Sequence, residues 1–198
     1  TVPFARFVVQ HQNQLVFPFK RYQIQPVWRA DRPQHGRYQE FYQCDGDIVG
    51  SDSLRNEVTL LKINQQVLTE LKLPGFTVKV NNRKVLTGIA QVCQAEKEII
   101  TLTVALDKLD KIGKEAVLEE IRQKGIEEAV IERISPLFEL QGNFSEKLSF
   151  LREFLATSEI GLKGLEELKY VHDKLHQLFG ENQLLELDVT LARGLNYY

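Results

Sequence analysis

Residues 23–50 read QIQPVWRADRPQHGRYQEFYQCDGDIVG, and this stretch decides how the N-terminal part of the chain folds. It contains two strand-like runs on either side of the segment Pro33, Gln34, His35 and Gly36, whose composition is typical of a tight turn. The sequence therefore predicts an antiparallel β-hairpin. Both arms carry charged and aromatic side chains, whereas a hairpin with a purely structural role typically carries small polar ones.

Side chains alternate between the two faces of a strand, so the faces of this hairpin can be assigned from the sequence. Arg29 and Asp31 share a face of the first arm. On the second arm one face holds Phe41, Gln43, Asp45 and Asp47, and the other holds Tyr38, Glu40, Tyr42 and Cys44. With the turn at 33–36, one face can present an arginine, an aromatic ring, an amide and several acids together.

Two interpretations of this face remain open on the residues alone. A guanidinium suits phosphate oxygens, a flat ring suits stacking on a base, and an amide beside a carboxylate suits a cationic amino group. These features favour a binding surface. The alternative is a solvated hairpin in which Arg29, Arg32 and Arg37 pair with Asp31 and Glu40, and such surface pairs are common and individually weak.

Three segments resemble the histidyl-tRNA synthetases, which are class II aminoacyl-tRNA synthetases. Residues 29–43, RADRPQHGRYQEFYQ, resemble the second signature motif of that family. Residues 191–198, LARGLNYY, resemble its histidine-specific motif, and residues 1–6, TVPFAR, resemble the end of a third segment. The three segments occur in the family's order over nearly the whole chain, which makes the match specific.

The resemblance implies a ligase that activates histidine with ATP and Mg²⁺ and transfers it to tRNA(His). Arg29 and Arg193 would be the catalytic residues, because fixed cations stabilise the charge that develops on the phosphoryl oxygens. ATP would be bound by Arg29 and by three further residues of the second motif. These are Asp31 at the adenine amino group, Arg37 at the outer phosphates and Phe41 stacked on the base.

Histidine would be bound by side chains from all three segments and by Asp47, which follows the second motif. The residues implied by the resemblance are Thr1, Gln43, Asp47, Arg193, Tyr197 and Tyr198. Satisfying both imidazole nitrogens in a partly buried site would reject amino acids of similar shape that lack them.

The sequence departs from the family pattern at three positions of the hairpin. Gln39 stands where many members have arginine, and Asp31 and Asp47 stand where glutamate is frequent. The family's first motif would precede this chain, and its third motif and anticodon-binding domain would follow it. We therefore expect the chain to be a fragment of a homodimeric enzyme, inactive or nearly so by itself.

Two rival functions differ in class from the ligase. One is the catalytically silent synthetase paralogue that serves as a regulatory subunit of histidine biosynthesis, although the retained residues 193–198 argue against it. The other is a plain interaction domain with no affinity for histidine or ATP. A module that binds only nucleic acid is weaker still, because the net charge is −2.

Composition limits the remaining classes. With 198 residues and 43% hydrophobic content, the chain is long enough to bury a core and is not of the disordered class. No apolar run is long enough for a membrane span and no secretory leader begins the chain, so a cytoplasmic protein is expected. Cys44 and Cys93 are too few for a disulfide framework or a zinc site and are expected to be ordinary reduced thiols.

The rest of the chain predicts an α+β fold. We expect an incomplete class II antiparallel sheet with flanking helices in residues 1–93, a small all-helical insertion in 94–180, and a return strand in 181–198. Ser51 and Asp52 are expected to cap a helix that ends before Pro74, and Asn81 and Asn82 to cap another. In the insertion, the following leucines and phenylalanine recur at helical spacing and predict helices: Leu148, Leu151, Phe154, Leu155, Leu162, Leu165, Leu168, Leu175 and Leu178. The charges of this insertion are expected to form a solvated face, and RNA contact is the alternative that the resemblance implies.

Overall fold

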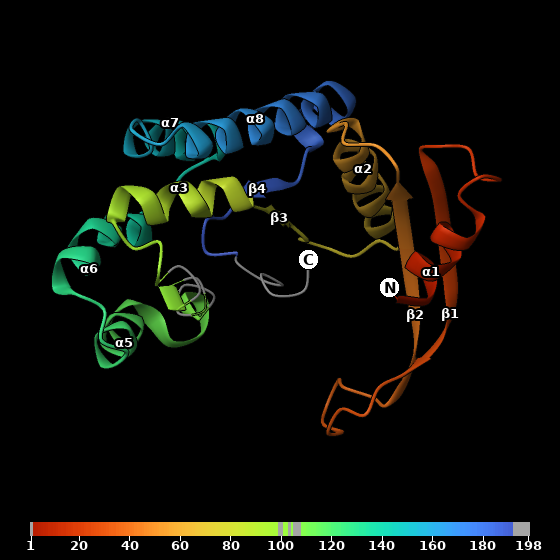
Figure 1. Ribbon diagram of the computed structural model, residues 1–198, viewed down its shortest axis with the longest axis horizontal. Coiled ribbons are helices and arrows are strands. Elements are labelled where there is room, and N and C mark those ends of the chain that lie inside the picture. The colour runs from red at the N-terminus through yellow and green to blue at the C-terminus, as the bar shows by residue number, and fades with distance from the viewer. Residues whose placement is uncertain (1, 99–100, 103, 105–107, 192–198) are drawn as a thin grey trace. The chain divides into compact units, whose positions relative to one another are not determined.

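The computed structural model describes residues 2–98, 101–102, 104 and 108–191 (Figure 1). The chain divides into two compact units, Thr1–Leu60 and Leu61–Tyr198, and the boundary falls within helix α2 (Arg55–Glu70). Helices and strands are mixed, and a two-stranded antiparallel sheet is present, which confirms the expected α+β class. None of the described helices combines the length and the apolar character needed to cross a membrane.

The first unit consists of helix α1 (Val2–His11), the strands β1 (Phe19–Trp28) and β2 (Glu40–Val49), and the start of α2. β1 and β2 pair antiparallel, from Phe19 opposite Val49 to Trp28 opposite Glu40, which confirms the predicted hairpin. Helix α1 packs on the hairpin through the rings of Phe4 and Phe7, whose centroids each lie 6.4 Å from that of Phe19.

The two faces of the hairpin differ in exposure, as the alternation of side chains predicts. Phe41, Gln43, Asp45 and Asp47 are half-buried, whereas Tyr42 and Cys44 on the other face are exposed. None of the described residues of the first unit is fully buried. The face that carries Phe41 is therefore the more enclosed side of a unit that lacks a core of its own among its described residues.

The turn of the hairpin lies one residue later than expected. The backbone groups of Gln34 and Arg37 hydrogen-bond to each other at 3.2 and 2.9 Å, with His35 and Gly36 between them. Gly36 has a φ of +74°, a left-handed conformation that glycine adopts without steric cost.

Helix α2 begins later than Ser51 and Asp52 suggested. Its first residue is Arg55, whose N–H donates to Ser53 Oγ at 3.4 Å, while Ser51 Oγ accepts the N–H of Ser53 at 3.2 Å. The hydroxyl that reaches the first helical residue is that of Ser53, one position beyond the predicted pair, so the predicted cap was wrong. The helix ends before Pro74, as expected.

The second unit contains a short sheet of β3 (Val78–Val80) and β4 (Leu185–Leu187). The two strands are distant in sequence and pair parallel, with Val80 opposite Leu187. Parallel pairing between them was not predicted. Strands of this kind need a long connection, which here is the helical stretch between them.

Helices cover this sheet and form most of the second unit. They are α3 (Arg83–Cys93), α5 (Leu109–Gln123), α6 (Glu128–Ile134), α7 (Phe144–Phe154) and α8 (Glu159–Phe179), with 3₁₀ turns at Ser135–Glu139 and Gly180–Asn182. Asn82 caps α3 by accepting the N–H of Lys84 at 2.9 Å, as predicted. Within residues 94–180, the described helices and 3₁₀ turns are the regular secondary structure that is present.

The core of the second unit joins α3, α5, α6, α7, α8 and β4. Its fully enclosed side chains include Val85, Ile121, Ile134, Leu151, Leu155, Leu165 and Leu187. Of the leucines that recur at helical spacing, Leu178 lies within α8 but off its buried stripe, because 52% of it is exposed. The apolar stripe of α8 continues from Leu175 to the half-buried Phe179, a step of four residues instead of three.

Helices α3 and α8 run side by side at glycine contacts (Figure 1). A Cβ atom placed on Gly88 would lie 2.6 Å from the Cα of Gly161, and one on Gly164 would lie 2.9 Å from the N of Val85. The two backbones therefore approach as closely as the absence of side chains allows. This contact fixes α3, and with it the segment that follows β3.

Candidate functional site

The enclosed face of the hairpin brings together three of the predicted site residues. Arg29 continues the pairing one residue beyond β1, because its backbone N–H donates to the Gln39 carbonyl at 2.9 Å. Its Nη2 then donates to Gln43 Oε1 at 3.0 Å, and its Cζ lies 5.3 Å from the centroid of the Phe41 ring. An exposed guanidinium is thus held over an aromatic ring by an amide of the opposite strand.

The Gln43 amide is held at both ends. Its oxygen accepts the hydrogen bond from Arg29, and its Nε2 donates to Asp45 Oδ1 at 2.6 Å. This geometry fixes which end of the amide faces Arg29, since the carboxylate can only accept. Asp45 was recognised in the sequence as a member of this face but was not assigned to the site.

Asp31 and Arg37 lie near the turn, where Asp31 is half-buried and Arg37 is exposed. Arg37 Nε and Asp31 Oδ2 are 3.8 Å apart, at the outer limit of an ion pair, and Gln39 Nε2 donates to the Asp31 carbonyl at 3.1 Å. Among the described hairpin residues, this is the one ion pair that the solvated-hairpin interpretation anticipated. Arg29 instead contacts an amide and a ring, which is the arrangement expected of a binding surface.

Asp47 pairs with Arg21, which was not predicted to belong to the site. Arg21 lies directly opposite Asp47 in the register, and its Nη2 is 2.7 Å from Asp47 Oδ2. The alternation of β1 would have placed Arg21 on this face had the register been known.

Four predicted site residues lie outside the residues that the structure describes. They are Thr1, Arg193, Tyr197 and Tyr198. The segment that leads to Arg193 is described as far as Leu191, and Asn81 holds it. The Asn81 side-chain amide donates to the carbonyls of Val189 and Leu191 at 3.2 and 3.1 Å. Asn81, expected only as a cap or turn residue, therefore fixes the approach to the predicted histidine-specific motif.

Asp188 anchors the same segment. Burial favours the neutral form of this carboxyl, but hydrogen bonds from Lys79 and Thr190 outweigh that effect and lower the pKa of Asp188 below its ordinary value. Lys79 Nζ lies 2.8 Å from Asp188 Oδ2, and Thr190 donates to Oδ1 from both its N–H and its hydroxyl, at 2.9 and 2.6 Å. The ionised carboxylate thus closes the turn that follows β4.

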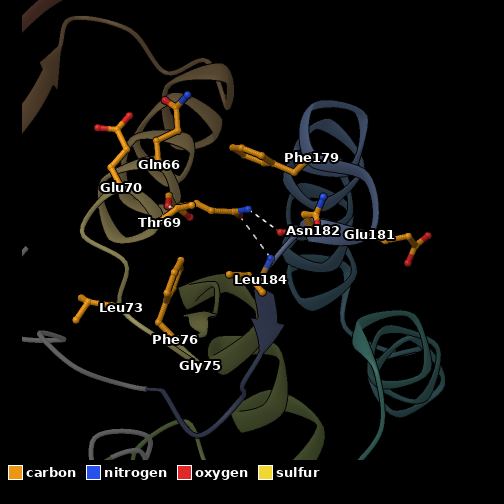
Figure 2. Close-up of a pocket in the computed structure, with 11 residues that line it drawn as sticks. Gln66, Thr69, Glu70, Leu73, Gly75, Phe76, Phe179, Glu181, Asn182 and Leu184 are labelled. Carbon is orange, nitrogen blue, oxygen red and sulfur yellow. Dashed lines mark hydrogen bonds between the residues drawn. The ribbon is translucent and has the colours of Figure 1, made fainter.

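A cavity of about 620 Å³ occupies another part of the second unit (Figure 2). Phe76 and Phe179 line it, together with Thr69 and Leu184. The buried Gln65 donates to the Asn182 carbonyl at 2.7 Å and accepts the Leu184 N–H at 3.5 Å, along the dashed lines of Figure 2. None of the described site residues lines this cavity, and the Gln65 amide is already hydrogen-bonded to the chain. We interpret this cavity as a gap left where α2 packs against the segment before β4.

Metal and thiol chemistry receive no support from the described residues. No three His, Cys, Asp or Glu side chains in the described part of the chain lie close enough together to hold a metal ion. Both cysteines are free, as expected. Burial raises the pKa of the Cys93 thiol to about 11 despite the nearby Arg133, so this thiol stays protonated at neutral pH.

Comparisons with known proteins identify the family of the chain. The family model described as Histidyl-tRNA synthetase matches residues 1–198. Over 198 residues the chain is 57% identical to the histidine–tRNA ligase of Christiangramia forsetii, which covers 100% of this chain and 43% of that protein. The chain therefore spans less than half the length of this relative.

Two solved structures resemble the whole chain in fold. The histidyl-tRNA synthetase from Nostoc sp. PCC 7120 gives a TM-score of 0.88 at 33% identity, and the match covers 100% of this chain and 46% of that one. An ATP phosphoribosyltransferase regulatory subunit/histidyl-tRNA synthetase from Bacillus halodurans C gives 0.81 at 20% identity, covering 100% and 50%. At that identity the second likeness concerns the fold alone. With the family model matched from the first residue to the last, the chain belongs to the histidyl-tRNA synthetase family.

Proposed function

We propose that the protein carrying this chain is a histidine–tRNA ligase, which activates histidine with ATP to histidyl-adenylate and transfers the histidyl group to tRNA(His). The observation that carries the proposal is the position of Arg29, held over Phe41 and hydrogen-bonded to Gln43 on the enclosed face of the hairpin. A cation, a ring and an amide within reach of one another match the phosphate, base and amino acid of an adenylate.

Four residues of the hairpin have a role in binding ATP in this proposal. Arg29 binds the α-phosphate and stabilises the negative charge that develops on it as the histidine carboxylate attacks and pyrophosphate leaves. Phe41 stacks on the adenine, and Asp31 accepts a hydrogen bond from its amino group. Arg37 neutralises the outer phosphates, a role that its exposure and its loose pairing with Asp31 permit. Mg²⁺ enters with the triphosphate, because this ion keeps several waters and binds largely through substrate phosphates.

The amino acid is bound at the other end of the same face. Gln43 and Asp47 bind the amino group or the imidazole of histidine, both of which offer N–H donors, and the Gln43 oxygen and the Asp47 carboxylate are acceptors. Thr1, Arg193, Tyr197 and Tyr198 complete the pocket, with Arg193 also assisting at the α-phosphate. These four roles rest on the resemblance of residues 1–6 and 191–198 to the family motifs, supported by the anchoring of residues 189–191 through Asn81.

The whole-protein features follow from the family and are proposals of the same kind. We propose a cytoplasmic homodimer in which residues 1–93 and 181–198 are part of the catalytic core and residues 94–180 form a helical insertion.

Pyrophosphate exchange tests the ligase directly. The full-length protein is incubated with ATP, Mg²⁺, labelled pyrophosphate and each of the twenty amino acids in turn. Histidine alone should support exchange of label into ATP. Binding of histidine without any exchange would point to the silent regulatory paralogue, and the absence of both would leave a plain interaction domain.

A further inference from the structure

Arg21 occupies a place in the hairpin that its ion pair alone does not explain. It lies opposite Asp47, at 2.7 Å, with 19% of its side chain exposed against 36% for Asp47. The neighbouring Lys20, one residue earlier, points to the other face and is exposed. Arg21 is thus the cation that the fold encloses on the same face as Gln43 and Asp47.

The guanidinium of Arg21 is held by groups other than Asp47. Its Nη1 donates to Gln23 Oε1 on the same strand. Its Cζ lies 4.0 Å from the centroid of the Phe4 ring, which helix α1 supplies. A guanidinium that stacks on a ring and is hydrogen-bonded at its edge has little rotational freedom. Arg21 can therefore hold the Asp47 carboxylate in place.

The ion pair leaves two buried polar atoms without a hydrogen bond. Arg21 Nε and Asp47 Oδ2 are both buried and have no hydrogen-bond partner among the described residues, so the 2.7 Å contact is an ion pair without hydrogen-bond alignment. An enclosed pair of this kind is a poor source of stability, because the cost of desolvation offsets most of the attraction. A pair retained for stability alone would be expected to have better hydrogen-bond geometry.

We propose that Arg21 is a positioning residue for the amino-acid substrate: it holds the Asp47 carboxylate on the enclosed face of the hairpin, where that carboxylate binds the amino group or the imidazole of histidine. The inference rests on the proposed function, in which Asp47 is a histidine ligand. Arg21 does not itself contact the substrate. Phe4 backs it, so that helix α1 contributes to amino-acid binding through the Arg21 side chain.

Steady-state pyrophosphate exchange with the full-length protein tests this role. Arg21→Met keeps the unbranched stem over Phe4 and removes the charge. Its KM for histidine should rise about tenfold or more, the usual consequence of losing an interaction with a charged group, while the KM for ATP stays within about twofold. Lys20→Met removes the same charge from the opposite face and should change neither constant. A merely structural defect would raise both constants together.

Two further variants make the outcome decisive. In Asp47→Asn the histidine KM should rise, and adding Arg21→Met to it should have no additional effect, because the carboxylate to be positioned is gone. Arg21→Lys retains the charge without the planar fork and should fall between wild type and Arg21→Met; it decides the question if Arg21→Met fails to fold. Equal additive effects of the two substitutions, or a wild-type histidine KM in both Arg21 variants, would overturn the inference.

The same data separate this inference from the proposed function. If the wild-type protein shows no histidine-dependent exchange, the ligase proposal fails and this inference fails with it. If wild type exchanges and Asp47→Asn weakens histidine, but the Arg21 variants behave as wild type, only the role of Arg21 is refuted.

Discussion

Replacing Arg29 with lysine separates a catalytic role from a structural one. The change keeps the positive charge but removes the planar fork that can hold a phosphate by two parallel hydrogen bonds. In the folded chain Arg29 is exposed and makes one side-chain hydrogen bond, 3.0 Å to Gln43, and one ring contact, 5.3 Å to Phe41. Exposed contacts of these kinds contribute about 1 kcal/mol or less to folding.

The expected effect on catalysis is much larger. Removing one preorganised donor from a developing charge lowers kcat on the order of 10²–10³-fold. Arg29→Lys should therefore reduce kcat for pyrophosphate exchange by that order in the full-length protein, while the free energy of unfolding changes by about 1 kcal/mol or less. Urea denaturation and exchange kinetics on the same preparation measure the two quantities.

A matched control lies three residues away. Arg32 is exposed near the turn and has no proposed role, so Arg32→Lys should leave kcat within about twofold of wild type, as surface changes generally do. The reasoning is refuted if Arg29→Lys costs less than about tenfold in kcat, equivalent to 1.4 kcal/mol. It is also refuted if the two arginines respond alike.

Three predictions concern the rest of the chain. Gly88→Ala should lower the free energy of unfolding by about 1–3 kcal/mol in urea melts, because its Cβ would lie 2.6 Å from the Gly161 backbone. The depressed pKa of Asp188 means that its ion pair stabilises the fold above the unfolded pKa near 3.8 and that this stability is lost as pH falls through the lower folded value. Asp188→Asn should therefore destabilise the fold at pH 7, by about 1.5–3 kcal/mol, with a difference from wild type that shrinks below about pH 4. With the Cys93 pKa near 11 and its side chain fully buried, a thiol reagent at pH 8 should modify only Cys44 in the native chain.

Each of these has its own control. Thr87→Ala, at the half-buried neighbour of Gly88, should destabilise the fold less than Gly88→Ala does, because it places no new atom against the Gly161 backbone. A constant difference between Asp188→Asn and wild type from pH 7 to pH 2 would exclude the linkage. Modification of both thiols at the same rate, or modification that persists in Cys44→Ser, would contradict the prediction that only Cys44 reacts.

The sequence was informative about the hairpin because alternation and turn chemistry are local. Arg29, Phe41 and Gln43 come together as their parity predicts, and Gly36 occupies the left-handed position that favours glycine. The register was not readable in the same way. Extending the Gln34–Arg37 pairing directly down the arms would put Gln43 opposite Trp28, whereas the structure places Glu40 there. The irregular residues of the loop absorb the difference, and for that reason Arg21 was missed.

The features that the sequence did not predict depend on contacts between distant segments. The parallel pairing of β3 with β4 joins residues more than a hundred positions apart, and no local pattern specifies it. Asn81 looks like a cap residue in sequence, yet its amide holds residues 189 and 191. Leu178 follows helical spacing as well as Phe179 does, and only the packing of α8 decides which of them is enclosed.

The central claim is that the hairpin face binds a histidyl-adenylate, and a thermal shift tests it most directly. The chain and the full-length protein are each heated with a non-hydrolysable histidyl-adenylate analogue, with the corresponding analogues of other amino acids, and as the Arg29→Ala variant. Because a ligand that binds only the folded state raises the midpoint, the account predicts a rise selective for the histidyl analogue and reduced by Arg29→Ala. No shift in either protein, or an equal shift with every aminoacyl analogue, would contradict it.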